Sequence, residues 1–249
     1  MTQTRVGALS VFFPAYNEEG IIATTVERAG QAVRELADDY EIIVVDDGSA
    51  DRTAAIVRQI SATDPHVRLV QHERNLGYGA ALRTGFASAR HELVFFSDAD
   101  GQFDLRELPG LLALLDKAPV VLGYRIRRND PPHRLFIAKV YNLIVRMVFG
   151  LRVHDIDCAY KLLRRDALER VTLESNGAFI SSELLIKLRR QNVPMVEHGV
   201  HHYPRTTGAS KGATVGVILK TIRDIIRLRL GQPLNPQAGA AAAVAKEPE

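Results

Sequence analysis

Residues 41–49 read Glu41-Ile42-Ile43-Val44-Val45-Asp46-Asp47-Gly48-Ser49, an apolar run that stops at two aspartates and a turn. A continuous Ile/Val run without polar alternation is typical of a strand buried on both faces of a parallel sheet. A second stretch has the same form, because Leu93-Val94-Phe95-Phe96 leads into Ser97-Asp98-Ala99-Asp100-Gly101-Gln102. Strands of this kind predict an α/β fold.

The segments on either side repeat this alternation of strand and helix. Further strands are expected at 8–13, 67–70 and 120–122, and helices at 18–36, 51–60, 78–89 and 105–115. The pattern predicts a single Rossmann-like domain with a mainly parallel central sheet flanked by helices. Ligands of such sheets bind at the carboxyl ends of the strands, which is where the polar clusters of this sequence fall.

Composition excludes several other classes of protein. The 249 residues are 46% hydrophobic and 24% charged, with a formal net charge of +3. The single cysteine, Cys158, excludes a disulfide framework and a cysteine-rich zinc site. There is no apolar signal core near residue 1 and no run of about 18 uncharged apolar residues, so we expect a cytoplasmic protein. Residues 1–7 are expected to be an extension, and the Ala- and Pro-rich residues 231–249 a disordered tail.

The pair Asp98-x-Asp100 is the first candidate site. Alternate residues of an extended segment point to the same side, so both carboxylates can reach one divalent cation. Oxygen ligands suit Mg²⁺ or Mn²⁺, and Gln102 could add a carbonyl oxygen. The alternative is a simple loop whose aspartates cap a helix, and Asp104 is expected to cap the next one.

Three other clusters should lie along the same edge. They are Pro14-Ala15-Tyr16-Asn17-Glu18, Val45-Asp46-Asp47-Gly48-Ser49 and Gly123-Tyr124-Arg125. Carboxylates there could accept hydrogen bonds from a base or ribose, and Tyr16 could lie beside a base. The alternative for the second cluster is a turn followed by a helix cap at Asp51. The convergence of the clusters is a stronger signal than any one of them.

Two further patterns favour structural interpretations. Gly77, Gly79 and Gly85 resemble a dinucleotide-binding fingerprint, but that fingerprint belongs after the first strand, so a tight entry into a helix is expected instead. His198, His201 and His202 could ligate a metal, but without a supporting ligand pattern they are expected to be strand-end residues.

The basic residues are unevenly distributed. Residues 131–154 contain no Asp or Glu, and Lys139, Asn142 and Arg146 form one narrow polar stripe on an otherwise apolar helix. Residues 215–229 form a second basic amphipathic helix. Each could be a core-packing helix, but together they favour contact with an anionic lipid surface over nucleic acid. The cationic loop at 205–211 could fold over a diphosphate or be a solvated linker.

Together these motifs resemble family 2 glycosyltransferases of the GT-A fold, and among them the dolichol-phosphate mannose synthase-like enzymes. The resemblance covers roughly residues 8–230. It also includes two motifs not yet described, Asn75-Leu76-Gly77-x-Gly79-x-Ala81 and Asp155-Ile156-Asp157-Cys158-Ala159-Tyr160-Lys161. It implies a nucleotide-binding half at 8–125 and an acceptor half at 126–230.

The resemblance also implies roles for individual residues. Nucleotide-sugar binding is expected of Pro14, Ala15, Tyr16, Glu18, Val45, Asp47, Asp98, Ala99, Arg125, Arg205 and Lys211. The expected ligands of Mg²⁺ or Mn²⁺ are Asp98, Asp100 and Gln102. The catalytic set is expected to include Asp98, Asp100, Arg125 and Arg134, with Asp157 or Glu183 as candidate base for a hydroxyl acceptor.

The implied reaction is inverting transfer of a hexose from a donor such as GDP-mannose or UDP-glucose to a polyprenyl phosphate. Many relatives of this kind carry C-terminal transmembrane helices, and this sequence shows no such run. The amphipathic helices could dock the protein on the cytoplasmic face of a membrane, or a membrane-anchoring partner could hold it. The acceptor could also be a glycan or small-molecule hydroxyl, and a non-catalytic nucleotide-binding protein is a third hypothesis.

Overall fold

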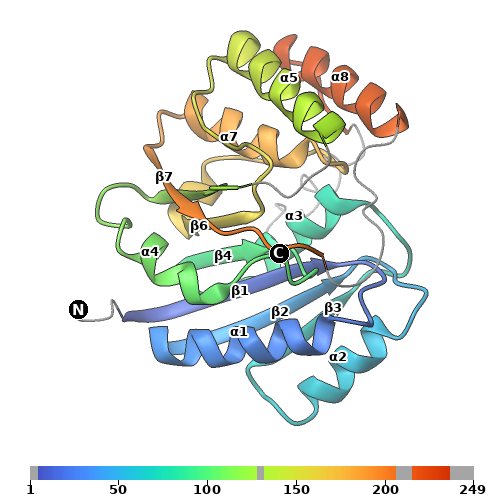
Figure 1. Ribbon diagram of the computed structural model, residues 1–249, viewed down its shortest axis with the longest axis vertical. Helices are drawn as coiled ribbons and strands as arrows, with labels where there is room; N and C mark the ends of the chain where they lie inside the picture. Colours follow the sequence, from blue (N-terminus) through green and yellow to red (C-terminus); the bar gives the residue numbers. More distant parts are fainter. Residues whose placement is uncertain (1–4, 128–131, 206–214, 236–249) are drawn as a thin grey trace, which may run out of the picture.

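The computed structural model describes residues 5–127, 132–205 and 215–235 and contains one seven-stranded sheet in these ranges (Figure 1). The strand order is β3-β2-β1-β4-β6-β5-β7. The strands are β1 (Val6–Ala15), β2 (Ala37–Asp46), β3 (Val67–Gln71), β4 (Leu93–Ser97), β5 (Val120–Arg125), β6 (Tyr160–Arg164) and β7 (Met195–Val200). The predicted α/β class with a mainly parallel sheet is therefore confirmed.

One strand runs against the others. β6 pairs antiparallel with both β4 and β5, whereas β1 pairs parallel with β2 and β4, and β5 with β7. The chain enters β6 at the edge where β4 ends, because Tyr160 lies opposite Ser97. A strand that starts at this edge can only run back toward the other one. The apolar pattern did not predict β6, and it gave no range for β7, although the histidines at 198, 201 and 202 are expected at a strand end.

Helices cover both faces of the sheet. On one side lie α1 (Ile22–Leu36), α2 (Thr53–Ser61), the short 3₁₀ helix η1 (Leu105–Glu107) and α4 (Leu108–Leu112). On the other side lie α3 (Tyr78–Ser88), the short α6 (Arg165–Glu169) and α7 (Ile180–Arg190). Each face has its own apolar core, as expected for a sheet buried on both sides.

Two more helices form an outer layer on the α7 side. α5 (Pro132–Phe149) and α8 (Val215–Arg229) lie side by side beyond α7 (Figure 1). Their bounds agree with the two basic amphipathic segments of the sequence. No described helix combines the length and the apolar character needed to cross a bilayer.

Several boundaries differ from the expectations. The first helix begins at Ile22 rather than Glu18, because residues 19–21 form a turn in which the backbone NH of Ile21 donates to the carbonyl of Glu18 at 3.0 Å. The helix expected at 105–115 is divided into η1 and α4, and Asp104 caps it as predicted by accepting from the backbone NH of Arg106. The packed domain continues beyond residue 230, because Leu234 is buried in the core on the α7 side. Residues 236–249 lie outside the described ranges.

A glycine contact between α3 and β1 provides a test of this packing. A Cβ at Gly85 would lie 2.3 Å from ring atoms of Phe12, which stacks against Phe96 in the core. We expect Gly85→Ala to lower the free energy of unfolding by about 1–3 kcal/mol, measured by urea denaturation.

The matched control is Gly216→Ala in α8, where an added Cβ meets nothing within 4 Å. It should be neutral or stabilise the protein by up to about 1 kcal/mol, since alanine favours helices. Equal effects of the two substitutions would contradict the close packing of α3 on β1.

Candidate functional site

The carboxyl ends of four strands meet at one edge of the sheet. β1 and β2 end together, with Ala15 opposite Asp46, and the backbone NH of Asp47 donates to the carbonyl of Ala15 at 2.9 Å. β4 runs parallel to β1 and ends just before Asp98. β5 runs in the same direction as β4, since both oppose β6. The four polar clusters therefore share one edge, as the sequence predicts.

The loops that follow β1 and β2 are joined by hydrogen bonds. The backbone NH of Asn17 donates to Ser49 Oγ at 2.9 Å, and Asn17 Oδ1 accepts from the backbone NH of Ala50 at 2.8 Å. The backbone NH of Glu18 donates to Thr53 Oγ1 at 2.8 Å. Asp51 accepts from the backbone NH of Thr53 at 2.9 Å, which confirms its expected capping role. The two segments expected to hold a nucleoside thus form one rigid unit.

Asp47 is buried and anchors the glycine motif. Its Oδ1 accepts from the backbone NH of Leu76 and its Oδ2 from that of Gly77, both at 2.9 Å. His72 Nδ1 lies 2.7 Å from Oδ1. Gly77 adopts a φ of 99°, and a Cβ on Gly79 would lie 2.3 Å from the carbonyl oxygen of Ser175. The glycines therefore make the tight entry into α3 that the sequence predicts.

Two other expected nucleotide contacts are also buried. Val45 is fully enclosed and Ala99 nearly so, and both side chains belong to the core. Only their backbone groups could contact a ligand. Their backbones still lie at the strand ends that carry Asp46 and Asp98.

Asp98 lies at the centre of the edge beside Tyr78. The Tyr78 hydroxyl, from the first residue of α3, donates to Asp98 Oδ1 at 3.1 Å. Burial, and next the negative charge of Asp100, raise the pKa of Asp98 to about 7. The same burial, with the charge of Asp98, raises the pKa of Tyr78 well above its ordinary value. Two neighbouring carboxylates are thus held where their charges are incompletely offset.

Arg205 reaches this centre from the segment after β7. It forms an ion pair with Glu18, and its Nη1 lies 3.7 Å from Asp100 Oδ2. Gln102 holds the segment in place, since its Nε2 donates to the Tyr203 carbonyl at 2.9 Å and its own carbonyl accepts from the Tyr203 NH at 2.8 Å. Glu18, Asp100, Gln102 and Arg205, all predicted from the sequence, are thereby brought together.

Arg125 extends the site on the other side of Asp98. Its Nε and Nη2 donate to the two carboxylate oxygens of Asp155 at 2.6 and 2.8 Å, in a bidentate pair that is largely buried. The neighbouring Asp157 is exposed, and its charge raises the pKa of Tyr78 and of Tyr141. The charge of Arg125 lowers the pKa of Asp98, so Arg125 lies near the carboxylate pair, and Asp157 lies near Tyr78, which donates to Asp98.

Lys161 is a site residue whose role the sequence did not reveal. It is fully buried in β6, and its Nζ donates to the carbonyls of Ile156, at 3.1 Å, and Cys158. Burial lowers the pKa of Lys161, and its positive charge lowers the pKa of Asp98. A lone lysine in the apolar run Tyr160-Lys161-Leu162-Leu163 was the available signal. Tyr78 gave none beyond its place in the glycine motif.

Glu183 has a structural environment. It is fully buried, it accepts from the backbone NH groups of Glu174 and Ser175 at 2.8 Å each, and it pairs with Lys187 at 2.7 Å. Arg83 supports the same loop through the carbonyls of Glu174 and Ser175. Glu183 therefore fixes the loop against which the glycine motif packs.

The remaining expected residues have these positions. Pro14 and Ala15 end β1, and Tyr16 lies in the loop beyond it. Arg134 lies in the first turn of α5, but its side chain is outside the described part of the structure, as is all of Lys211. His198 lies within β7 and pairs with Gly123, while His201 and His202 directly follow the strand, as expected.

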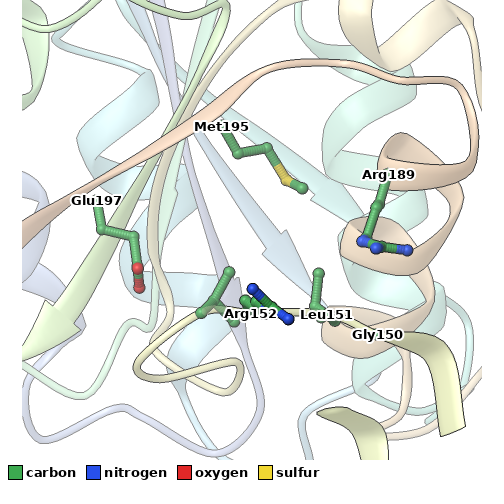
Figure 2. Close-up of a pocket in the computed structure, with 7 residues that line it drawn as sticks. Gly150, Leu151, Arg152, Arg189, Met195 and Glu197 are labelled. Atoms are coloured by element: carbon green, nitrogen blue, oxygen red, sulfur yellow. The ribbon is translucent and has the colours of Figure 1, made fainter. Parts of the chain in front are cut away.

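A cavity of about 360 Å³ lies elsewhere, at the end of α5 and along β7 (Figure 2). It is lined by Gly150, Leu151, Arg152, Val153, Arg189, Met195 and Glu197. None of these residues belongs to the polar clusters at the strand ends. Glu197 is already paired with His154 at 2.9 Å, so we do not assign the donor to this cavity.

The carboxylates of Asp98 and Asp100 are the candidate ligands for a metal ion. Within the described residues, no three or more His, Cys, Asp or Glu side chains gather into a metal-binding group. Asp98 and Asp100 alone provide two hard oxygen ligands, and the charge of Asp100 raises the pKa of Asp98. Mg²⁺ and Mn²⁺ are commonly held by one or two carboxylates together with water and substrate phosphates, so the pair fits such an ion.

Comparison with known proteins identifies the family. Residues 10–172 match the model of glycosyl transferase family 2. The chain belongs to this family. It is 31% identical, over 91% of its length and 69% of the relative's, to the undecaprenyl-phosphate 4-deoxy-4-formamido-L-arabinose transferase of Salmonella choleraesuis (strain SC-B67).

Solved structures confirm the GT-A fold of this family 2 enzyme. Glucosyl-3-phosphoglycerate synthase from Mycobacterium tuberculosis, in complex with Mn²⁺ and UDP-glucose, matches with a TM-score of 0.68 and 22% identity. That match covers 91% of this chain and 80% of the other. Another solved structure, described only as a mycobacterial protein, matches with a TM-score of 0.69 and 23% identity, over 91% of this chain and 76% of the other.

The raised pKa of Asp98 predicts how stability depends on pH. An unfolded aspartate titrates near 3.9, so between about pH 4 and pH 7 the folded, metal-free protein binds the extra proton. Its free energy of unfolding should therefore fall as pH rises through this window. Asp98→Asn, which is always neutral, should lack this part of the fall and be more stable than the parent at pH 8.

Urea denaturation in EDTA at pH 5.5 and pH 8 measures both effects. Asp116→Asn, at an exposed position away from the site, should follow the parent. An identical pH dependence in the parent and in Asp98→Asn would contradict the burial of this carboxylate beside Asp100.

Proposed function

We propose that this family 2 glycosyltransferase transfers a hexose, from a donor such as UDP-glucose or GDP-mannose, to a polyprenyl phosphate with inversion. The observation that supports this most is the convergence of Glu18, Asp98, Asp100 and Arg205 at the carboxyl edge of the sheet. The relative named for undecaprenyl-phosphate supports the acceptor class. The mycobacterial structure that holds Mn²⁺ and UDP-glucose supports the donor class.

The donor nucleoside is assigned to the joined loops after β1 and β2. Tyr16 offers a ring beside the base, and Glu18 offers a carboxylate acceptor nearby. Asp47 contributes indirectly, since its oxygens hold the backbone of Leu76 and Gly77. The backbone groups of Val45 and Ala99 complete the nucleotide-facing edge.

Asp98 and Asp100, with Gln102, are assigned to a divalent cation, Mg²⁺ or Mn²⁺. When bound, such an ion offsets the charge of the donor diphosphate and makes it a better leaving group. Arg205 pairs with Glu18 and lies beside Asp100, and we assign it, with Lys211, to the diphosphate oxygens. When the guanidinium of Arg205 leaves its carboxylate partners for the phosphate oxygens of the donor, its positive charge stays paired.

The acceptor side is assigned to Arg125, Arg134 and Asp157. Arg125 is fixed by its bidentate pair with Asp155, so its position is set before substrate arrives. A lipid phosphate is already anionic and needs no strong general base. If the acceptor is a hydroxyl, exposed Asp157 is the better candidate base than Glu183, whose oxygens are committed to the 174–175 backbone and Lys187.

Donor turnover tests this assignment. Purified protein is incubated with Mn²⁺, a panel of nucleotide sugars and a short-chain polyprenyl phosphate, and release of nucleoside diphosphate is followed. Release should require both metal and lipid. Asp100→Ala should lower kcat about 100-fold or more, because it removes a metal ligand. The exposed Asp116→Ala should stay within about twofold of the parent.

Other outcomes lead to other assignments. Donor binding with release that depends on a glycan or small-molecule hydroxyl, and not on the lipid, would reassign the acceptor. Absence of binding to any donor would contradict the proposed enzyme and leave a non-catalytic scaffold protein.

A further inference from the structure

The outer helices expose an unusual amount of apolar surface. Eleven large apolar side chains are exposed among the described residues, and eight of them lie on α5, on α8 or directly after α8. These eight, which we call the docking face, are Ile137, Val140, Leu143, Met147, Leu219, Ile222, Ile226 and Leu230. Their spacing of three or four residues aligns them into one stripe on each helix.

The protein core does not need these stripes. The opposite sides of the same helices already supply Val145, Ile225 and Leu228 to the core on the α7 side, all at least 93% buried. Each helix is therefore apolar on two sides, whereas a surface helix in water ordinarily has one apolar face. Met147 and Leu219 remain 68% and 62% exposed. A concentrated apolar patch of this kind marks an interaction surface.

The charges around the docking face select its partner. α5 and α8 carry exposed cations among their described side chains, including Lys139, Arg146, Lys220 and Arg223. The one carboxylate in the sequences of the two helices, Asp224, is 2% exposed and lies 3.8 Å from Arg223. A second copy of the chain would bring like charges together. An anionic lipid surface supplies the opposite charge and an apolar interior at the same time.

We propose that the docking face binds an anionic lipid bilayer, with α5 and α8 lying in the interface and their apolar stripes inserted below the head groups. This goes beyond the proposed reaction, since it requires neither donor nor acceptor. It also fits the layout of the chain. α5 follows the segment that starts at Arg125, and α8 follows the loop that starts at Arg205, so contact with a bilayer would bring membrane-borne compounds to the site edge.

Vesicle flotation of the full chain, without donor or acceptor, tests the proposal. The protein should float with vesicles of phosphatidylcholine containing 30% phosphatidylglycerol (a proportion on the order of that in anionic membranes). It should bind pure phosphatidylcholine at least tenfold more weakly. Raising the salt concentration should weaken binding to the anionic vesicles.

Two variants separate the apolar and electrostatic contributions. Leu143→Gln, Met147→Gln, Leu219→Gln and Ile226→Gln together remove the apolar stripes. Lys139→Gln, Arg146→Gln, Lys220→Gln and Arg229→Gln together remove four cations. Each should lower the partition coefficient at least tenfold, and thermal melting should be unchanged because all eight positions are exposed or lie outside the core.

The matched control removes four exposed cations from other surfaces, through Arg28→Gln, Arg58→Gln, Lys117→Gln and Arg170→Gln. Its net charge equals that of the cation variant, and it should bind like the parent. If the control variant bound vesicles as weakly as the cation variant, net charge alone would explain the loss of binding, and the proposal would be overturned. Absence of vesicle binding, or a concentration-dependent dimer that the apolar variant dissociates, would also overturn it. Loss of catalysis has no bearing on any of these results.

Discussion

The repulsion between Asp98 and Asp100 is the constraint around which the rest of the site is built. Both follow a fully buried strand, and burial with mutual repulsion raises the pKa of Asp98 to about 7. Such a pair is stable only if positive groups surround it. Arg125 and Lys161 lower the pKa of Asp98 from the side of β5 and β6, and Arg205 approaches Asp100 from beyond β7. The antiparallel β6 is what places a buried lysine behind the pair.

A second set of contacts fixes the shape of the edge. Asp47 binds the backbone at Leu76 and Gly77, and the glycine motif in turn packs without side chains against the 174–177 loop. Arg83 donates to the carbonyls of this loop, and Glu183 accepts from its backbone NH groups. Asp47 and Glu183 are thereby committed to backbone NH groups, and this leaves Glu18, Asp98, Asp100 and Asp157 as the carboxylates assigned to ligands.

The sequence predicts a residue's role when that role depends on neighbouring residues in the chain, and not when it depends on contacts with distant segments. The apolar runs before Asp46 and Asp98 predict parallel strands and their shared edge, because burial on both faces leaves a direct pattern. Asp104 and Asp51 are predictable as caps because each accepts from a backbone NH only two residues further along the chain. β6, β7, the Arg125–Asp155 pair and the buried Lys161 depend on contacts between distant segments. Glu183 is a candidate base by sequence, but its oxygens accept from the backbone of Glu174 and Ser175. A carboxylate in an apolar helix is compatible with either role, so the sequence alone does not distinguish them.

The account assigns a divalent cation and the donor diphosphate to the edge between β1, β4 and the segment after β7. The most direct test is anomalous diffraction from crystals grown with Mn²⁺ and a nucleoside diphosphate. The account predicts a manganese peak within ligand distance of Asp98 and Asp100, with the diphosphate against Arg205. A peak elsewhere, or a nucleotide seated in the cavity between Arg152, Arg189 and Glu197, would contradict it.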